Sequence, residues 1–145
     1  MTDKQKKYLD RFYEVAFTAS DCLEVFIAIY ASLGDYSFNR DRLINFINYC
    51  KNNSMFTNIL EDITLKTNGV SFYSENFEEA ITRLKFSGVL YTISPEQDGT
   101  IYINKNFSIT DLLKNKTNYI DDVTNFINEY KKFEKENNTS RILKW

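Results

Sequence analysis

The sequence contains no histidine among its 145 residues. Histidine is the commonest general base in enzymes, the usual partner of a serine or cysteine nucleophile, and the commonest transition-metal ligand. The two cysteines, Cys22 and Cys50, are too few for a zinc site built from cysteine alone. Four glycines are too few and too scattered to form a Walker or dinucleotide-binding loop. These absences predict a protein that is not an enzyme and that holds no metal and no cofactor.

Pairs of carboxylates are the catalytic groups that remain. Glu75 and Glu79 stand one helical turn apart, and Glu61 and Asp62 are adjacent. Such pairs can act as acid and base or hold Mg²⁺. Acidic residues at a helix start also have a sufficient structural cause, because they interact favourably with the helix dipole. We therefore interpret these carboxylates as part of a solvated helix surface.

Long apolar runs and an excess of positive charge are also missing. The formal net charge is −2, from 18 basic and 20 acidic residues, which weighs against nonspecific nucleic-acid binding. No run reaches the ~18 apolar residues of a membrane span, and Met1 to Arg11 is polar and charged, unlike a signal peptide. The cysteines show no CxxC spacing, which favours reduced, buried thiols. We expect a cytoplasmic protein that does not associate with a membrane.

The composition that is present belongs to an ordinary globular protein. Hydrophobic residues make up 43% and charged residues 26% of the chain, so wholesale disorder is not expected. The length is that of one domain, residues 1 to 145. Aromatic residues are abundant, with 12 Phe and 10 Tyr, enough to fill a core and to supply a binding surface.

Residues 74 to 87 carry the clearest helical pattern. Four apolar residues recur at the spacing i, i+3, i+4 and i+7: Phe77, Ala80, Ile81 and Leu84. Ser74 is placed to cap the first turn, and Gly88 is placed to end the helix in the left-handed conformation. The segment predicts an amphipathic helix.

A β-hairpin is predicted directly after this helix. Residues 89 to 94 and 100 to 104 are rich in β-branched and aromatic side chains. Pro95 to Gly99 lies between them and has the composition of a tight turn. Ser87-Gly88-Val89-Leu90, with the helix before it and the hairpin after it, resembles the recognition helix and wing of the winged helix-turn-helix superfamily. The resemblance covers residues 20 to 107 and implies an α+β fold, mostly α-helical, with one wing.

The rest of the chain is predicted to be largely helical. Cys22 to Leu33 is almost wholly apolar and reads as the central core helix. Residues 36 to 38 read as a short extended piece of the kind that pairs with a wing. Further helices are predicted over these ranges: 3 to 17 as an N-terminal extension, 40 to 51 with Asn39 as its cap, 55 to 66 with Ser54 as its cap and Thr67-Asn68-Gly69 as its end, and 117 to 134. Residues 108 to 113 read as a short helix or a turn. The tail from 136 to 145 is expected to be frayed.

Two functions follow as alternatives. The resemblance implies a transcriptional regulator that binds double-stranded DNA, and the candidate contacts are Thr82, Arg83, Lys85, Lys66, Lys105, Arg40 and Arg42. Residues 74 to 107, however, hold three basic and five acidic side chains, a net charge of 3 − 5 = −2. The alternative is a non-enzymatic protein-contact module, such as an adaptor, a subunit or an inhibitor, with interface candidates Glu75, Glu79, Phe86 and Tyr73. A homodimer through the terminal helices is a further expectation.

Overall fold

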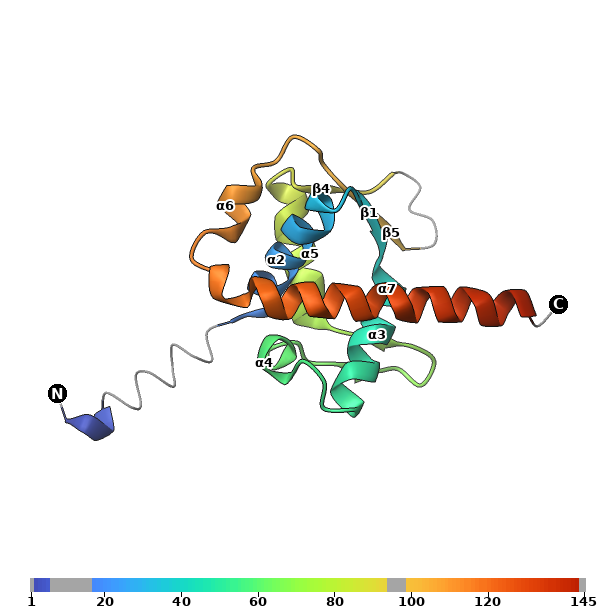
Figure 1. The fold of residues 1–145 in the computed structure, drawn as a ribbon, viewed down its shortest axis with the longest axis horizontal. Coiled ribbons are helices and arrows are strands. Elements are labelled where there is room, and N and C mark those ends of the chain that lie inside the picture. Colours follow the sequence, from blue (N-terminus) through green and yellow to red (C-terminus); the bar gives the residue numbers. More distant parts are fainter. Residues whose placement is uncertain (1, 6–16, 94–98, 144–145) are drawn as a thin grey trace.

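A computed structural model describes residues 2–5, 17–93 and 99–143, and it has the predicted fold class, α+β and mostly α-helical (Figure 1). The greater part of the predicted N-terminal helix, 3 to 17, lies outside the described residues. None of the helices in the described ranges is long and apolar enough to cross a membrane.

Helix α2 (Ala19–Ser32) is the centre of the core, as its apolar sequence predicts. The Thr18 side chain accepts a hydrogen bond from the Asp21 amide, and Asp21 in turn accepts one from the Thr18 amide, which forms a capping box. Three helices pack on α2: α5 (Glu75–Phe86), α6 (Ile109–Leu113) and α7 (Ile120–Leu143). Because it is covered on several sides, α2 can be apolar on almost its whole circumference.

Aromatic side chains join α2 to its neighbours. Phe26 of α2 meets Phe126 and Tyr130 of α7 edge to face, with ring centroids 6.2 Å apart in both pairs. Phe46 of α3 (Arg40–Asn52) packs against the same two rings at 5.1 and 5.5 Å. These buried rings supply a large apolar area and specific packing geometry in one cluster.

The predicted hairpin is confirmed and forms part of a three-stranded antiparallel sheet. Strands β4 (Leu90–Tyr91) and β5 (Thr100–Ile103) pair with each other, and β1 (Ser37–Asn39) pairs with the other edge of β5, so the order is β1-β5-β4. The predicted pairing of residues 36 to 38 with the wing is therefore confirmed for β1. Residues 94–98, most of the predicted turn, lie outside the described residues.

The helix predicted over 55 to 66 is wrong. Only α4 (Thr57–Leu60) is helical there, and Ser54, the expected cap, has a φ of 54°. Phe56 has a φ of 56°, and two left-handed residues so close together interrupt an α-helix. Farther on, β2 (Lys66–Thr67) pairs with β3 (Phe72–Tyr73) in a second hairpin. Its turn, residues 68 to 71, begins with the Asn68-Gly69 pair that was expected to end the helix.

The C-terminal helix is longer than predicted. A turn of 3-10 helix, η1 (Thr117–Tyr119), precedes α7, which continues through Leu143 instead of ending near 134. In Figure 1 the last turns of α7 project past the other elements, where a frayed tail was expected. Among residues 120 to 136 of α7, whose side chains are described, four are buried: Val123, Phe126, Ile127 and Tyr130.

Candidate interaction surfaces

The outward face of α5 was predicted as the contact surface of either function. Its four apolar residues point into the core, as predicted, and Ser74 caps the helix through its hydroxyl, which accepts a hydrogen bond from the Phe77 amide at 3.3 Å. Glu75, Glu79, Thr82 and Arg83 are exposed on the other side. Phe86, the last residue of α5, is 89% exposed. The face therefore combines charged side chains with one unprotected aromatic ring.

Three of the predicted DNA contacts are paired with carboxylates of α5. Lys66 Nζ lies 3.0 Å from Glu75 Oε1, Arg40 Nε lies 3.3 Å from Glu78 Oε1, and Arg83 Nη2 lies 4.0 Å from Glu79 Oε2. The hydrogen bond to Glu75 raises the pKa of Lys66. Each pair cancels much of the positive potential that a phosphate would experience. The structure thus gathers these cations around α5 together with an equal number of acids.

The other candidate cations lie on separate elements. Lys85 is half-buried on α5, and Arg42 is exposed in the first turn of α3, where the Asn39 side chain accepts a hydrogen bond from its amide at 3.0 Å. Lys105 follows β5 and lies over the ring of Tyr36, 4.9 Å from its centroid, a cation–π contact.

A second exposed surface, the β2–β3 hairpin, was missed from the sequence. Val70 at its turn is 93% exposed, and Phe72 and the predicted interface residue Tyr73 are also exposed. The Asn68 side chain holds the turn, since its oxygen accepts hydrogen bonds from the amides of Val70 and Ser71, both at 3.0 Å. An Asn-Gly pair followed by Val-Ser-Phe-Tyr is a hairpin signal that would have identified this element.

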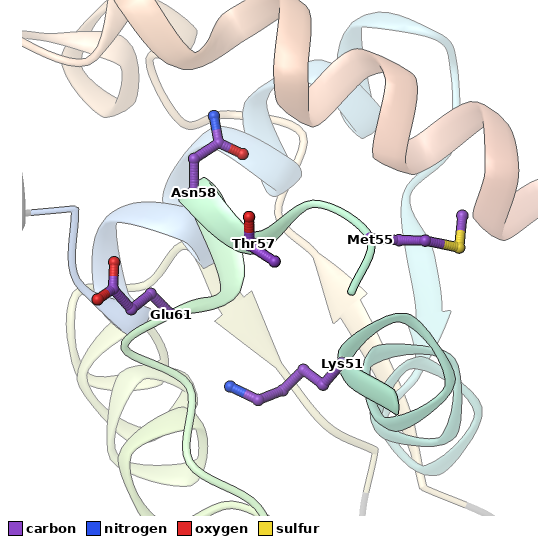
Figure 2. Close-up of a pocket in the computed structure, with 5 residues that line it drawn as sticks. All are labelled: Lys51, Met55, Thr57, Asn58 and Glu61. Atoms are coloured by element: carbon purple, nitrogen blue, oxygen red, sulfur yellow. The ribbon is translucent and has the colours of Figure 1, made fainter. Parts of the chain in front are cut away.

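A shallow pocket lies between the end of α3 and α4, and its volume is about 430 Å³ (Figure 2). It is lined by Lys51, Met55, Thr57, Asn58 and Glu61. The Lys51 ammonium donates hydrogen bonds to the carbonyls of Leu60 and Ile63, at 3.0 and 2.7 Å. Its charge is therefore engaged at the C-terminal end of α4, where a cation interacts favourably with the helix dipole.

The cysteine side chains offer no reactive group at these surfaces. Cys22 and Cys50 are free and buried, as predicted. Burial raises the pKa of each thiol to about 12, with a smaller contribution from Asp21 for Cys22 and from Glu129 for Cys50. A thiol in this state is a poor nucleophile, because the thiolate is the reactive form. Among the described residues, no group of three or more acidic or cysteine side chains is placed to hold a metal ion.

Comparison with known proteins gives no match: no protein family, no curated protein and no solved structure is significantly similar to this chain.

Proposed function

We propose that the protein is a non-enzymatic protein-contact module with a winged-helix-like core. The partner would bind the α5–wing surface, which we define as the exposed side chains of α5 and those at and just after β4, the strand that packs against it: Glu75, Glu79, Thr82, Arg83, Phe86, Tyr91 and Ile93. A module of this kind acts by binding, as an adaptor, a subunit or an inhibitor of a larger assembly.

The order of the elements supports the winged-helix-like part of the proposal. Helix α2, strand β1, helix α3, helix α5 and the hairpin β4–β5 occur in this order along the chain, and β1 pairs with β5. Helix α4 and the β2–β3 hairpin lie between α3 and α5, where a helix-turn-helix has only a short turn. Such a fold presents α5 and the wing together on one side. The fold resemblance alone says nothing about which kind of molecule is bound, because function depends on the side chains of the site.

We propose a protein as the partner because Phe86 is exposed. The Phe86 side chain is 89% exposed, and contact between an apolar ring and water is unfavourable. Aromatic rings commonly anchor protein interfaces, where they are removed from water. On α5 and next to it, three of the candidate cations are paired with Glu75, Glu78 and Glu79. These carboxylates would repel phosphates, whereas contacts made by the Phe86 ring need no cation.

The test is affinity purification from the native cell with the wild type and three variants. We expect the wild type to retain a stoichiometric partner, and Phe86→Asp and Glu79→Lys to lose it. Val70→Asp serves as the matched control, because Val70 is an equally exposed apolar residue on a different element. Recovery of no partner, or a partner that is retained by Phe86→Asp, would contradict the proposal.

DNA binding is the second candidate, supported by the same order of elements, in which α5 and β4–β5 stand where a recognition helix and wing would be. It predicts affinity for duplex DNA that falls steeply with salt. Arg83→Ala and Lys85→Ala would then weaken binding more than Lys114→Ala, an exposed charge at the end of α6. Absence of duplex binding at low salt would remove this candidate.

A further inference from the structure

We propose that two copies of this chain associate by exchanging hairpins, with Val70 at the β2–β3 turn of each copy inserted into the pocket at α4 of the other. This contact is separate from the α5–wing surface, and it names a second copy as the occupant of the pocket.

The tip of the β2–β3 hairpin is ordered and apolar, so it can serve as a plug, a preformed group that fills a pocket. The tip is apolar and almost fully exposed at Val70, yet the turn is held by the Asn68 hydrogen bonds and by Gly69, which has a φ of 88°. An ordered tip loses little conformational freedom when it binds, so more of the contact energy is kept.

The pocket offers a matching receptor. Because the ammonium group of Lys51 is held by two carbonyls, the aliphatic stem of this side chain, with Met55 and Thr57, forms the apolar part of the lining (Figure 2). The volume of about 430 Å³ accommodates the side chain of Val70 with neighbouring parts of the turn. Asn58 and Glu61 add polar groups to the lining that can meet the polar backbone of the turn.

Charge complementarity favours a second copy as the occupant. Lys66 stands at the base of the hairpin and is about half-exposed, and Glu61 is exposed beside the pocket. An ammonium group has three donors, so Lys66 can keep Glu75 and also reach Glu61 of the other copy. The same arrangement argues against DNA as the occupant, since Glu61 and Glu75 would repel phosphates.

The position of the two features permits a closed dimer. Both α4 and β3 pack against α3, and Figure 1 places α4 and the light green β2–β3 segment along the same edge of the molecule. When a plug and its receptor share one region of the surface, a two-fold axis lets each copy supply both. The exchange then buries two tips and closes without forming a filament.

Sedimentation velocity of the full chain over a range of concentrations tests the proposal. We expect a concentration-dependent dimer of the 17.1 kDa chain. Val70→Asp should raise the dimer dissociation constant by about tenfold or more, and Phe86→Asp should leave it unchanged. Circular dichroism would verify that Val70→Asp is folded, as expected for a side chain this exposed.

Exchanging the charges of Glu61 and Lys66 gives a second test of the dimer contact. Glu61→Lys should weaken the dimer. The addition of Lys66→Glu and Glu75→Gln in the same chain should restore it, because the pair is re-formed with its signs reversed and no carboxylate is left beside position 66. A monomer at every concentration, a dimer that is insensitive to Val70→Asp, or a triple variant weaker than Glu61→Lys would overturn the proposal. Loss of the cellular partner with an intact dimer concerns the α5–wing surface alone, so the two proposals fail separately.

Discussion

The carboxylate of Asp62 accepts a hydrogen bond from the backbone amide of Ala19, the first residue of α2, at 2.7 Å. Asp62 belongs to the connection between α3 and α5, which is far longer than a helix-turn-helix turn. The same connection is held to the start of α5 by Asn76, whose side-chain oxygen accepts from the Thr64 amide at 3.4 Å and whose amide group donates to the Asp62 carbonyl. One short segment thus fixes the starts of two core helices.

Replacing Asp62 should destabilise the fold. Asp62→Ala leaves the Ala19 amide without its acceptor and removes a negative charge from the start of α2, and each effect costs free energy. We expect a loss of about 1–2 kcal/mol in the free energy of unfolding, measured by urea denaturation. Asp62→Asn should lose less, since its side-chain oxygen still accepts. Glu61→Ala, measured where the chain is monomeric, is the control; an equal loss there would contradict this assignment.

Gly99 is expected to be intolerant of any side chain. Its φ is 74°, and a Cβ added to it would lie 2.9 Å from Asp41 Oδ2. Its carbonyl also accepts the Arg40 amide at 2.9 Å, which ties the end of the wing to the start of α3. Gly99→Ala should therefore lower the free energy of unfolding by about 1–3 kcal/mol.

Gly69→Ala separates the two causes of this loss. Gly69 has a similar φ of 88°, but nothing lies within 4 Å of a Cβ built there, so only backbone strain is added. We expect Gly99→Ala to cost only slightly more than Gly69→Ala, because Asp41 Oδ2 is the end of an exposed side chain and can move away. Asp41→Ala should recover that small difference in the double variant. Equal costs at the two glycines would show that the approach of Asp41 has no effect.

Local signals made α5, β4 and β5 predictable. The cap at Ser74, the apolar spacing through Leu84 and the positive φ of 82° at Gly88 depend on residues close together in the sequence. The helix prediction for residues 55 to 66 was wrong for the opposite reason. The apolar residues there fit a helix, but Ile59, Leu60 and Ile63 are buried by a chain that turns at Ser54 and Phe56. That conformation is sustained by tertiary contacts, such as the bonds from Lys51, which no local pattern reveals.

The exposure of the candidate residues on α5 was predictable, but their ion pairs with other elements were not. The sequence named Glu75, Glu79 and Phe86 as interface candidates, and all three are exposed. Their contact with a partner stays a prediction. The pairing of Arg40 with Glu78 depends on how α3 and α5 cross, which the sequence does not specify. Dimerisation through the terminal helices stays a prediction.

Lys116 is expected to anchor the C-terminal part of the chain to α2. Its ammonium group pairs with Glu24 and lies 3.5 Å from Asp21 Oδ1, and all three side chains are about three-quarters or more buried. Lys116→Met leaves two carboxylates close together with reduced solvation and no counter-charge. We expect a loss of about 1–3 kcal/mol in unfolding free energy by urea denaturation.

The matched control is Lys114→Met, two residues earlier at an exposed position. It removes the same charge and adds the same side chain without leaving a carboxylate pair behind. If both variants lose the same stability, net charge and not the contact with Glu24 is responsible.

The buried thiols should make stability fall in alkaline solution. In the unfolded chain a thiol titrates near its ordinary value of 9.0, but in the folded protein burial raises the pKa of both Cys22 and Cys50 to about 12. Above pH 9 the unfolded state therefore releases protons that the folded state retains, which favours unfolding. The stabilising contribution is complete below pH 9 and disappears as the pH approaches 12, at roughly 1 kcal/mol per pH unit for each thiol.

Two tyrosines also make stability fall with rising pH, but they begin to do so at a higher pH than the thiols. The contribution of the thiols can therefore be measured separately. Burial raises the pKa of Tyr30 from 10.0 to about 12, and burial with the Glu134 hydrogen bond raises that of Tyr130 further. Urea denaturation from pH 8 to 11 under reducing conditions should show stability falling from about pH 9 in the wild type. In the Cys22→Ala, Cys50→Ala double variant the fall should begin near pH 10, where the tyrosines contribute, followed by Lys66, whose pKa is also raised. Because the comparison is between slopes, the cavity cost of the substitutions does not affect it, and identical slopes between pH 9 and 10 would show that the thiols are not protected by the fold.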